Sequence, residues 1–293
     1  MGEIKVIHER LDFQPQKLHL SIWKAHSTNI KGVIAGIHGL TSHGEQCFHY
    51  FGPYMAERGW TTIAVDMPGL GHWAPENKKA EKLHWSMNGR TIASLLKWCR
   101  KYAPNKKLIL VGVSISVVSS IEHILKNNGN QNSLPDCTIF AVPALNVQLP
   151  IYAYPIFLSL GILTPNIKLG LKRFEPDIKS NDPASIINQV NPYSLKEISV
   201  GYATEMYRSM RKLKMKRKKN PMSKWPKNIP ILMLTAGLDT VTKVKYSRFF
   251  YNMLPQEIFT RYIHYERAHH YLFYEDNRDV IFEDIYQFLN DSV

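Results

Sequence analysis

Cysteine is scarce in this chain, which contains three cysteines among 293 residues. Cys47, Cys99 and Cys137 are far apart in the sequence, so they form no metal-binding pattern, and an odd number cannot pair completely into disulfides. This argues against a disulfide-stapled secreted domain and is typical of a reducing compartment. We therefore expect buried thiols in a cytoplasmic protein, with no nucleophilic role for cysteine.

Long hydrophobic runs are absent as well. Residues Met1 to Val6 include no apolar stretch of the signal-peptide type, and they do not fit the N-myristoylation pattern. The most apolar segment, Leu149 to Leu163, contains Pro150 and Pro155 and is shorter than the about 20 residues that a transmembrane helix needs. No internal repeat or low-complexity segment is visible. We expect no membrane-spanning helix.

Acidic residues are fewer than basic ones, since 24 Asp and Glu stand against 37 Lys and Arg for a net charge of +13. Such a charge attracts nucleic acid, anionic lipid or acidic proteins. Because no aromatic-interleaved basic motif is present, we expect no nucleic-acid partner. The basic residues concentrate between Arg208 and Lys227, which predicts peripheral contact with an anionic membrane or, alternatively, a solvated helix face and loop. The cluster comprises Arg211, Lys212, Lys214, Lys216, Arg217, Lys218 and Lys219.

What the chain does contain is a large hydrophobic fraction, 44%, arranged as alternating strand and helix signals. Apolar or β-branched runs predict strands at Ile4–Leu11, Lys17–Trp23, Gly32–Ile37, Thr61–Val65, Lys107–Val111, Cys137–Val142, Ile229–Leu234 and Thr260–His264. Helical spacing predicts helices at Cys47–Arg58, Met87–Tyr102, Val117–Leu125 and Arg278–Leu289. This alternation indicates an α/β fold in which helices cover both faces of a mainly parallel sheet.

The alternation breaks between Asn146 and Lys227, where strand signals disappear. This stretch begins with the apolar run Leu149–Leu163, continues through polar loops and a predicted helix at Glu197–Met210, and ends in the basic run. We interpret residues 146–227 as a helical cap inserted into a discontinuous core of residues 1–145 and 228–293. The oligomeric state does not follow from the sequence.

Five residues between a strand and a helix, Gly112-Val113-Ser114-Ile115-Ser116, carry the strongest chemical signal. A serine flanked at two positions on either side by small residues is typical of a nucleophile elbow, because larger side chains would collide in so tight a turn. Ser114 would then be exposed above the sheet at a helix N-terminus, where the dipole favours a developing oxyanion. An ordinary strand-to-helix turn is the alternative for the motif taken alone.

A nucleophilic serine needs a base and an orienting carboxylate. Asp239 follows the strand 229–234, at the sheet edge where ligand-facing groups gather. His270 follows the strand 260–264, in a loop that can reach the elbow, and His269 is the alternative register. The order Ser114, Asp239, His270 is that of the α/β-hydrolase triad.

An oxyanion hole needs two backbone N–H groups that point at the reacting carbonyl. Ile115 follows the nucleophile, and Leu40 lies in the loop His38-Gly39-Leu40 after an early strand, so both are the expected donors. A metal site at His38, His43 and His49 is a weak alternative, since neither a carboxylate nor a cysteine completes it. Asp66, in Asp66-Met67-Pro68-Gly69-Leu70-Gly71, is expected to be structural.

Together these pieces resemble the α/β-hydrolases of the monoacylglycerol lipase, lysophospholipase and serine aminopeptidase-like group. The matching motifs are His38-Gly39-Leu40, Asp66-Met67-Pro68-Gly69-Leu70-Gly71, Gly112-Val113-Ser114-Ile115-Ser116, Val142-Pro143-Ala144-Leu145, Gly237-Leu238-Asp239 and Ala268-His269-His270-Tyr271-Leu272. The resemblance implies an eight-stranded sheet, a Ser114–Asp239–His270 triad and an oxyanion hole at Leu40 and Ile115. The chain departs from the family at Ser116-Val117, where glycines are usual, and at Arg267, where a glycine is usual.

The resemblance implies hydrolysis of carboxylic esters through an acyl-enzyme on Ser114, with neither metal nor organic cofactor. Small-molecule lipid esters such as monoacylglycerols or lysophospholipids are the expected substrates, bound by the cap. Thioesters are an alternative, as are aminoacyl amides of the proline iminopeptidase type, for which Glu175, Asp177, Asp182, Glu197 and Glu205 could supply an acidic subsite. A catalytically silent receptor of the same fold is the alternative outside enzymes.

Overall fold

The structure is a computed structural model of the chain, and it describes residues 4–13, 16–27, 29–72, 84–146, 153–170, 193, 195, 197–213 and 220–293. Its centre is an eight-stranded sheet with the order β1-β2-β4-β3-β5-β6-β9-β10. The strands are β1 (Ile7–Phe13), β2 (Gln16–Trp23), β3 (Gly32–Ile37), β4 (Trp60–Val65), β5 (Lys107–Val113), β6 (Cys137–Ala141), β9 (Ile231–Ala236) and β10 (Thr260–Tyr265). β2 pairs antiparallel with β1 and β4, and the other pairs are parallel, which confirms the predicted fold class.

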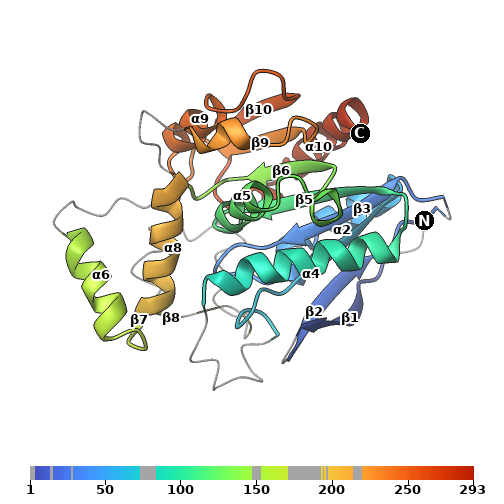
Figure 1. Cartoon of the computed structure of the whole chain (residues 1–293). Coiled ribbons are helices and arrows are strands. Elements are labelled where there is room, and N and C mark those ends of the chain that lie inside the picture. Colours follow the sequence, from blue (N-terminus) through green and yellow to red (C-terminus); the bar gives the residue numbers. More distant parts are fainter. Residues whose placement is uncertain are drawn as a thin grey trace.

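Helices cover both faces of this sheet (Figure 1). They are α1 (Gly44–Phe48), α2 (Phe51–Glu57), α4 (Ser86–Tyr102), α5 (Ser116–Lys126), α6 (Ala153–Leu163), α8 (Val200–Leu213), α9 (Val244–Tyr251) and α10 (Arg278–Ser292), with short 3-10 turns η1 (Gln131–Ser133), η3 (Pro221–Lys224) and η4 (Leu272–Tyr274). None of the helices in the described ranges is long and apolar enough to cross a membrane.

Two hydrophobic cores follow from the alternation of side chains along the buried strands. On β5, Leu108 and Leu110 face a core shared with α4 and α5, whereas Ile109 and Val111 face a second core shared with α2 and α10. These four side chains are at most 2% exposed. Because both faces of the central strands are buried, the strands read as continuous apolar runs in the sequence.

The helix predicted over residues 47–58 is two helices, because α1 ends at Phe48 and α2 begins at Phe51. Proline has no N–H and is tolerated only in the first turn of a helix. The break places Pro53 in the first turn of α2. A single continuous helix would have put this proline in its interior.

Between β6 and β9 the chain forms α6 and α8, which pack side by side at one end of the sheet (Figure 1). The expectation that this stretch lacks strands was wrong, because β7 (Lys168–Gly170) and β8 (Glu197–Ser199) form a separate antiparallel pair. The helix predicted from Glu197 accordingly begins at Val200, and the Ser199 hydroxyl accepts the backbone N–H of Tyr202 at 3.1 Å. A serine that bonds this way just ahead of a helix caps its first turn.

Candidate active site

Ser114 lies in the turn between β5 and α5 with a φ of +58°, in the left-handed region that residues other than glycine rarely adopt. A strained serine at this point of an α/β sheet is the geometry of a nucleophile elbow. The turn is fixed to the end of β6, because the Ser114 N–H donates to the Ala141 carbonyl at 2.9 Å and the Ser114 carbonyl accepts the Ala144 N–H at 3.1 Å. Ser114 is 8% exposed.

Ser116 stands where the related hydrolases usually have glycine, and its hydroxyl is used in the turn. It accepts the Val113 N–H at 2.8 Å and lies 2.9 Å from the Val113 carbonyl and 3.0 Å from the Ile37 carbonyl. Ile37 ends β3, the neighbouring strand. The side chain therefore joins the elbow to β3 through hydrogen bonds that a glycine could not make.

The predicted base and acid both reach the elbow. His270 Nε2 lies 3.0 Å from Ser114 Oγ, and His270 Nδ1 lies 2.8 Å from Asp239 Oδ2. Asp239 follows β9 and His270 follows β10, so parallel neighbouring strands deliver the two side chains to the same edge of the sheet. One imidazole thus contacts both the serine and the carboxylate.

Asp239 is held as a carboxylate. Burial alone would raise its pKa, but the hydrogen bond and charge of His270, together with hydrogen bonds from Thr242, outweigh this and hold the pKa of Asp239 below its usual value. Its Oδ1 accepts the N–H groups of Val241 and Thr242, each at 2.8 Å, and its Oδ2 accepts the Thr242 hydroxyl at 2.5 Å. These donors fix the carboxylate toward His270.

Of the two adjacent histidines, His270 is the one that contacts Ser114 and Asp239. His269 points elsewhere: its backbone N–H donates to Glu275 Oε1 at 2.5 Å, and its Nδ1 lies 3.1 Å from the same oxygen. The His269 side chain is 46% exposed.

The loop after β3 lies against the elbow. A side chain at Gly39 would place its Cβ only 3.3 Å from Ser114 Cβ, so glycine permits this close approach. Leu40, the next residue, and Ile115, the N-cap of α5, both line the cavity that contains Ser114 and His270. N–H groups at the start of a helix have no acceptor within it, which leaves the Ile115 N–H suited to an incoming oxygen.

Buried polar side chains hold this loop in place. His38 is buried, and its Nε2 accepts the Met67 N–H at 2.9 Å. Asp66 Oδ1 accepts the Gly44 N–H at 2.7 Å. The loop after β4 is therefore bonded to both ends of the segment 38–44. The Asp66 carboxylate bonds a backbone N–H group here, which agrees with the structural role expected of it.

A cavity of about 320 Å³ opens above Ser114. One side of the cavity is formed by the loop after β3, the turn that carries Ser114 and residues 270–274. Another side is formed by Phe157 on α6, Ile198 on β8 and the α8 side chains Met206, Tyr207 and Met210. The lining is mostly apolar, and among the described residues it contains no Asp or Glu. Such a site suits an elongated apolar ligand more than a charged amine.

Residues 28–277 match the family described as "Serine aminopeptidase, S33". The chain belongs to this hydrolase family. Comparison with solved structures shows that this S33 hydrolase shares their fold. A soluble variant of monoglyceride lipase from Saccharomyces cerevisiae, solved with a substrate analog, is 16% identical with a TM-score of 0.81, and the match covers 100% of this chain and 98% of that one.

Two further structures extend the likeness. A carboxyl esterase from Bacillus coagulans, in complex with glycerol, is 15% identical with a TM-score of 0.76 and covers 98% of each chain. A monoacylglycerol lipase from Paleococcus ferrophilus is 17% identical with a TM-score of 0.74, over 95% of this chain and 100% of that one. At these identities the likeness shows a shared α/β-hydrolase fold. No curated protein matches this S33 hydrolase by sequence.

The structure of this S33 hydrolase does not bring together the histidines considered for a metal. His38 is used in the loop contacts above, and His49 is exposed between α1 and α2. The cysteines are free and buried, and burial raises the pKa of Cys47 and of Cys137 to about 12, so neither provides a thiolate at neutral pH. Of the basic cluster, Arg211 and Lys212 end α8, and Lys214, Lys216, Arg217, Lys218 and Lys219 lie outside the described residues.

Two parts of the site escaped prediction from the sequence. Thr242 donates twice to Asp239, and its place three residues after that aspartate was the available signal. The Tyr271 hydroxyl lies 3.2 Å from the Thr41 hydroxyl, which joins the histidine loop to the loop after β3. No sequence pattern indicates that pair, because the two residues meet only when the strands assemble.

Proposed function

We propose that this S33 hydrolase cleaves carboxylic esters, with Ser114 as the nucleophile, His270 as the general base and Asp239 as the residue that orients it. The observation that supports this most directly is the continuous contact from Asp239 Oδ2 through His270 to Ser114 Oγ. A carboxylate on Nδ1 favours the tautomer whose Nε2 accepts a proton, and it stabilises the imidazolium formed in the reaction.

The reaction has two stages, acylation of Ser114 and hydrolysis of the acyl-enzyme. His270 Nε2 takes the Ser114 proton as Oγ attacks the ester carbonyl, and the N–H groups of Leu40 and Ile115 stabilise the resulting oxyanion. Collapse expels the alcohol, which leaves with the proton from His270. Water then gives a proton to His270 and attacks the acyl-enzyme, and the acid departs as Ser114 regains its proton. The steps need neither metal nor organic cofactor.

Within esters, we propose lipid-like substrates with one acyl chain, such as monoacylglycerols or lysophospholipids. The apolar wall formed by Phe157, Met206, Tyr207 and Met210 supports this, because it offers burial for methylene groups rather than hydrogen bonds. In this proposal residues 146–227 form a cap over the core, residues 1–145 and 228–293. A thioester with the same acyl group would meet the same residues, and only an assay separates the two.

The family description gives aminoacyl amides as a second candidate. A peptidase that takes a free amine needs an acidic group in its cavity, and the described lining has none. Glu205 bonds the Trp85 N–H at 2.6 Å, and Glu197 is exposed on β8. Glu175, Asp177 and Asp182 lie outside the described residues. The described cavity therefore favours esters.

We also propose peripheral contact with an anionic membrane through the exposed end of α6. Leu160, Ile162 and Leu163 are 43%, 67% and 76% exposed there. Arg211 and Lys212 lie at the other end of the helix pair, because α6 and α8 run antiparallel, with Gly161 against Thr204 and Phe157 against Tyr207. An exposed apolar segment on a chain of net charge +13 suits the boundary between acyl chains and anionic headgroups.

The decisive test compares Ser114→Ala with the matched control Ser223→Ala, in an exposed serine on η3. We expect Ser114→Ala to fold normally, to lose labelling by a fluorophosphonate probe and to lose ester hydrolysis. Ser223→Ala should keep both. Hydrolysis or labelling retained by Ser114→Ala would overturn the assignment, and a wild-type protein that is never labelled would favour the silent receptor.

A further inference from the structure

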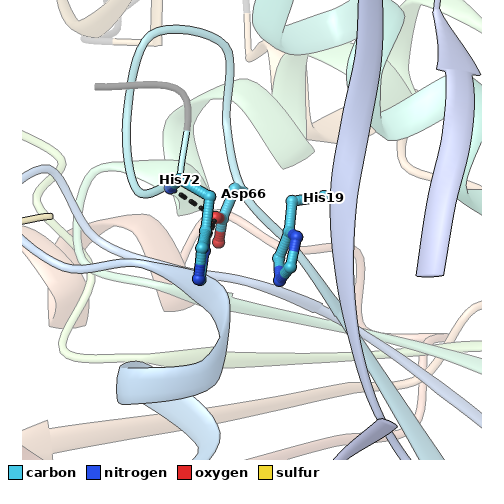
Figure 2. A group of neighbouring side chains, drawn as sticks. All are labelled: His19, Asp66 and His72. Carbon is cyan, nitrogen blue, oxygen red and sulfur yellow. Dashed lines mark hydrogen bonds and ion pairs between the residues drawn. The ribbon is translucent and has the colours of Figure 1, made fainter. Parts of the chain in front are cut away.

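A group of potential metal ligands lies away from Ser114, at the loop that follows β4. His19 projects from β2, and Asp66 and His72 come from the loop after β4, so strand pairing brings the three together (Figure 2). One ligand atom from each lies within 4.8 Å of the others, and no other group in the described part of the chain meets this condition. The proposed ester hydrolysis uses none of these three side chains.

The distances within the group are close to those of a coordination sphere. His72 Nδ1 lies 2.8 Å from Asp66 Oδ2, and the His19 and His72 rings stack with centroids 3.8 Å apart. Metal–ligand bonds to N and O of about 2.1 Å allow two ligand atoms to lie at most about 4.2 Å apart. An imidazole binds a metal in the plane of its ring, and the two stacked rings are only 20° from parallel, so at least one ring would have to turn, besides shifting, for both to reach one ion.

A fourth ligand is within reach. His8 Nδ1 on β1 lies 3.1 Å from His19 Nε2, a separation that two ligands of a tetrahedral ion adopt. His8 is exposed, so water could take its place. Its other nitrogen, Nε2, lies 3.7 Å from Glu45 Oε2, a carboxylate that can orient a ligating imidazole.

The carboxylate in the group is already ordered by the backbone. Asp66 is fully buried, its Oδ1 accepts the Gly44 N–H at 2.7 Å, and its Oδ2 accepts the His72 N–H at 2.9 Å. Gly71 has a φ of +62°, and a Cβ there would collide with Asp66 Oδ2, so glycine allows the loop to wrap this closely around the carboxylate. A ligand oriented in advance loses little freedom when it binds an ion.

We propose that His19, Asp66 and His72, with His8 or water as the fourth ligand, bind one divalent transition-metal ion. Two or three imidazoles and one carboxylate form a donor set that suits Zn²⁺ and related ions, whereas Mg²⁺ and Ca²⁺ prefer oxygen alone. The ion would join β1 and β2 to the loop after β4. Because it binds the folded chain and not the unfolded one, it stabilises the fold.

The alternative is that these residues serve only as a hydrogen-bonded support for the loop, with no affinity for metal.

The test uses the full chain without a polyhistidine tag, stripped with a chelator and dialysed. Zn²⁺ is titrated by calorimetry, Co²⁺ by its visible absorption, and thermal unfolding is followed with and without Zn²⁺. The variants His19→Gln and His72→Asn keep polar side chains and thus favour folding, and His26→Ala, in an exposed turn, is the matched control. These measurements do not depend on ester hydrolysis, so they separate this proposal from the proposed function.

We expect one Zn²⁺ per chain, a higher unfolding temperature with Zn²⁺, and a Co²⁺ spectrum of tetrahedral type. His19→Gln and His72→Asn should each weaken Zn²⁺ binding at least about tenfold, and His26→Ala should bind like wild type. The proposal is overturned if wild type binds no stoichiometric Zn²⁺, if its unfolding temperature does not respond, or if His26→Ala loses as much affinity as the two ligand variants.

Discussion

The Ser116 hydroxyl lies 3.0 Å from the carbonyl oxygen of Ile37, and so it connects the turn that carries Ser114 to the strand that leads into the loop with Leu40. The two predicted N–H donors, Leu40 and Ile115, thus belong to segments held together by one buried side chain. The relative position of these two donors determines how well they fit a single oxyanion.

This arrangement predicts the effect of Ser116→Ala. The change removes the partner of the Val113 N–H and the contact with Ile37, so we expect the free energy of unfolding to fall by about 1–3 kcal/mol. Ester hydrolysis should also decrease. Ser119→Ala is the control, because that hydroxyl bonds only the Ser116 carbonyl, at 3.0 Å. If urea unfolding showed equal losses of unfolding free energy in the two variants, the role given to Ser116 would be contradicted.

Asp239→Asn should lower kcat by about 10⁴ with little change in KM, because the amide favours the wrong tautomer of His270. The same variant tests stability against pH. The folded-state pKa of Asp239 lies below its unfolded value, so the folded chain binds fewer protons between the two values. The stabilisation that the Asp239 carboxylate contributes is complete above the unfolded pKa of about 3.9. It is lost as the pH falls through the lower folded-state value.

We therefore expect the urea midpoint of wild type to fall more steeply on acidification below about pH 5 than that of Asp239→Asn. Asp276→Asn, at an exposed position, should keep the wild-type slope. Parallel slopes in wild type and Asp239→Asn would show that this carboxylate is not stabilised by the fold.

The α8 wall predicts how chain-length preference changes. Met206 is half-buried and lines the cavity, so Met206→Trp should fill the space for an acyl chain. We expect kcat/KM for long p-nitrophenyl esters to fall about tenfold or more, with little change for acetate. Arg208→Trp places the same ring on the exposed side of α8. It should leave the ratio of kcat/KM for long esters to kcat/KM for acetate unchanged. A uniform loss for all esters in Met206→Trp would place the acyl chain elsewhere.

Membrane contact predicts that the chain sediments with phosphatidylserine vesicles, less so at high salt, and weakly with phosphatidylcholine vesicles. Replacing Ile162 and Leu163 by serine should reduce binding. Lys97→Ala, at an exposed position on α4, is the control. No sedimentation of wild type with anionic vesicles would rule out the contact.

The sequence predicts the sheet and the proximity of Ser114, Asp239 and His270, for a physical reason. Parallel strands that are buried on both faces appear in the sequence as apolar runs. Residues that follow such strands meet at one edge of the sheet, as Asp239 and His270 do beside Ser114. Predictions were weaker where tertiary pairing overrides local pattern. β8 forms because it can pair with β7, and the helix break before Phe51 depends on one proline.

Contacts between distant segments could not be predicted. The group of His19, Asp66 and His72 combines a strand residue with two loop residues, and only the antiparallel pairing of β2 with β4 brings them together. His38 and His43 are closer in sequence, but His38 accepts the Met67 N–H and His43 packs edge-on against His72, with ring centroids 5.4 Å apart. Spacing along the chain indicates a metal site only when one local segment supplies the ligands.

The cavity described above has two walls of different origin. The residues proposed to react come from loops spread along the sheet, from Gly39 to His270. The side chains proposed to face the acyl chain, Phe157, Ile198, Met206 and Met210, come from one continuous stretch between β6 and β9. That stretch leaves the sheet after β6 and returns at its neighbour β9. Under the proposed function, substrate selectivity would therefore change through substitutions in this one stretch, while the residues around Ser114 stay the same.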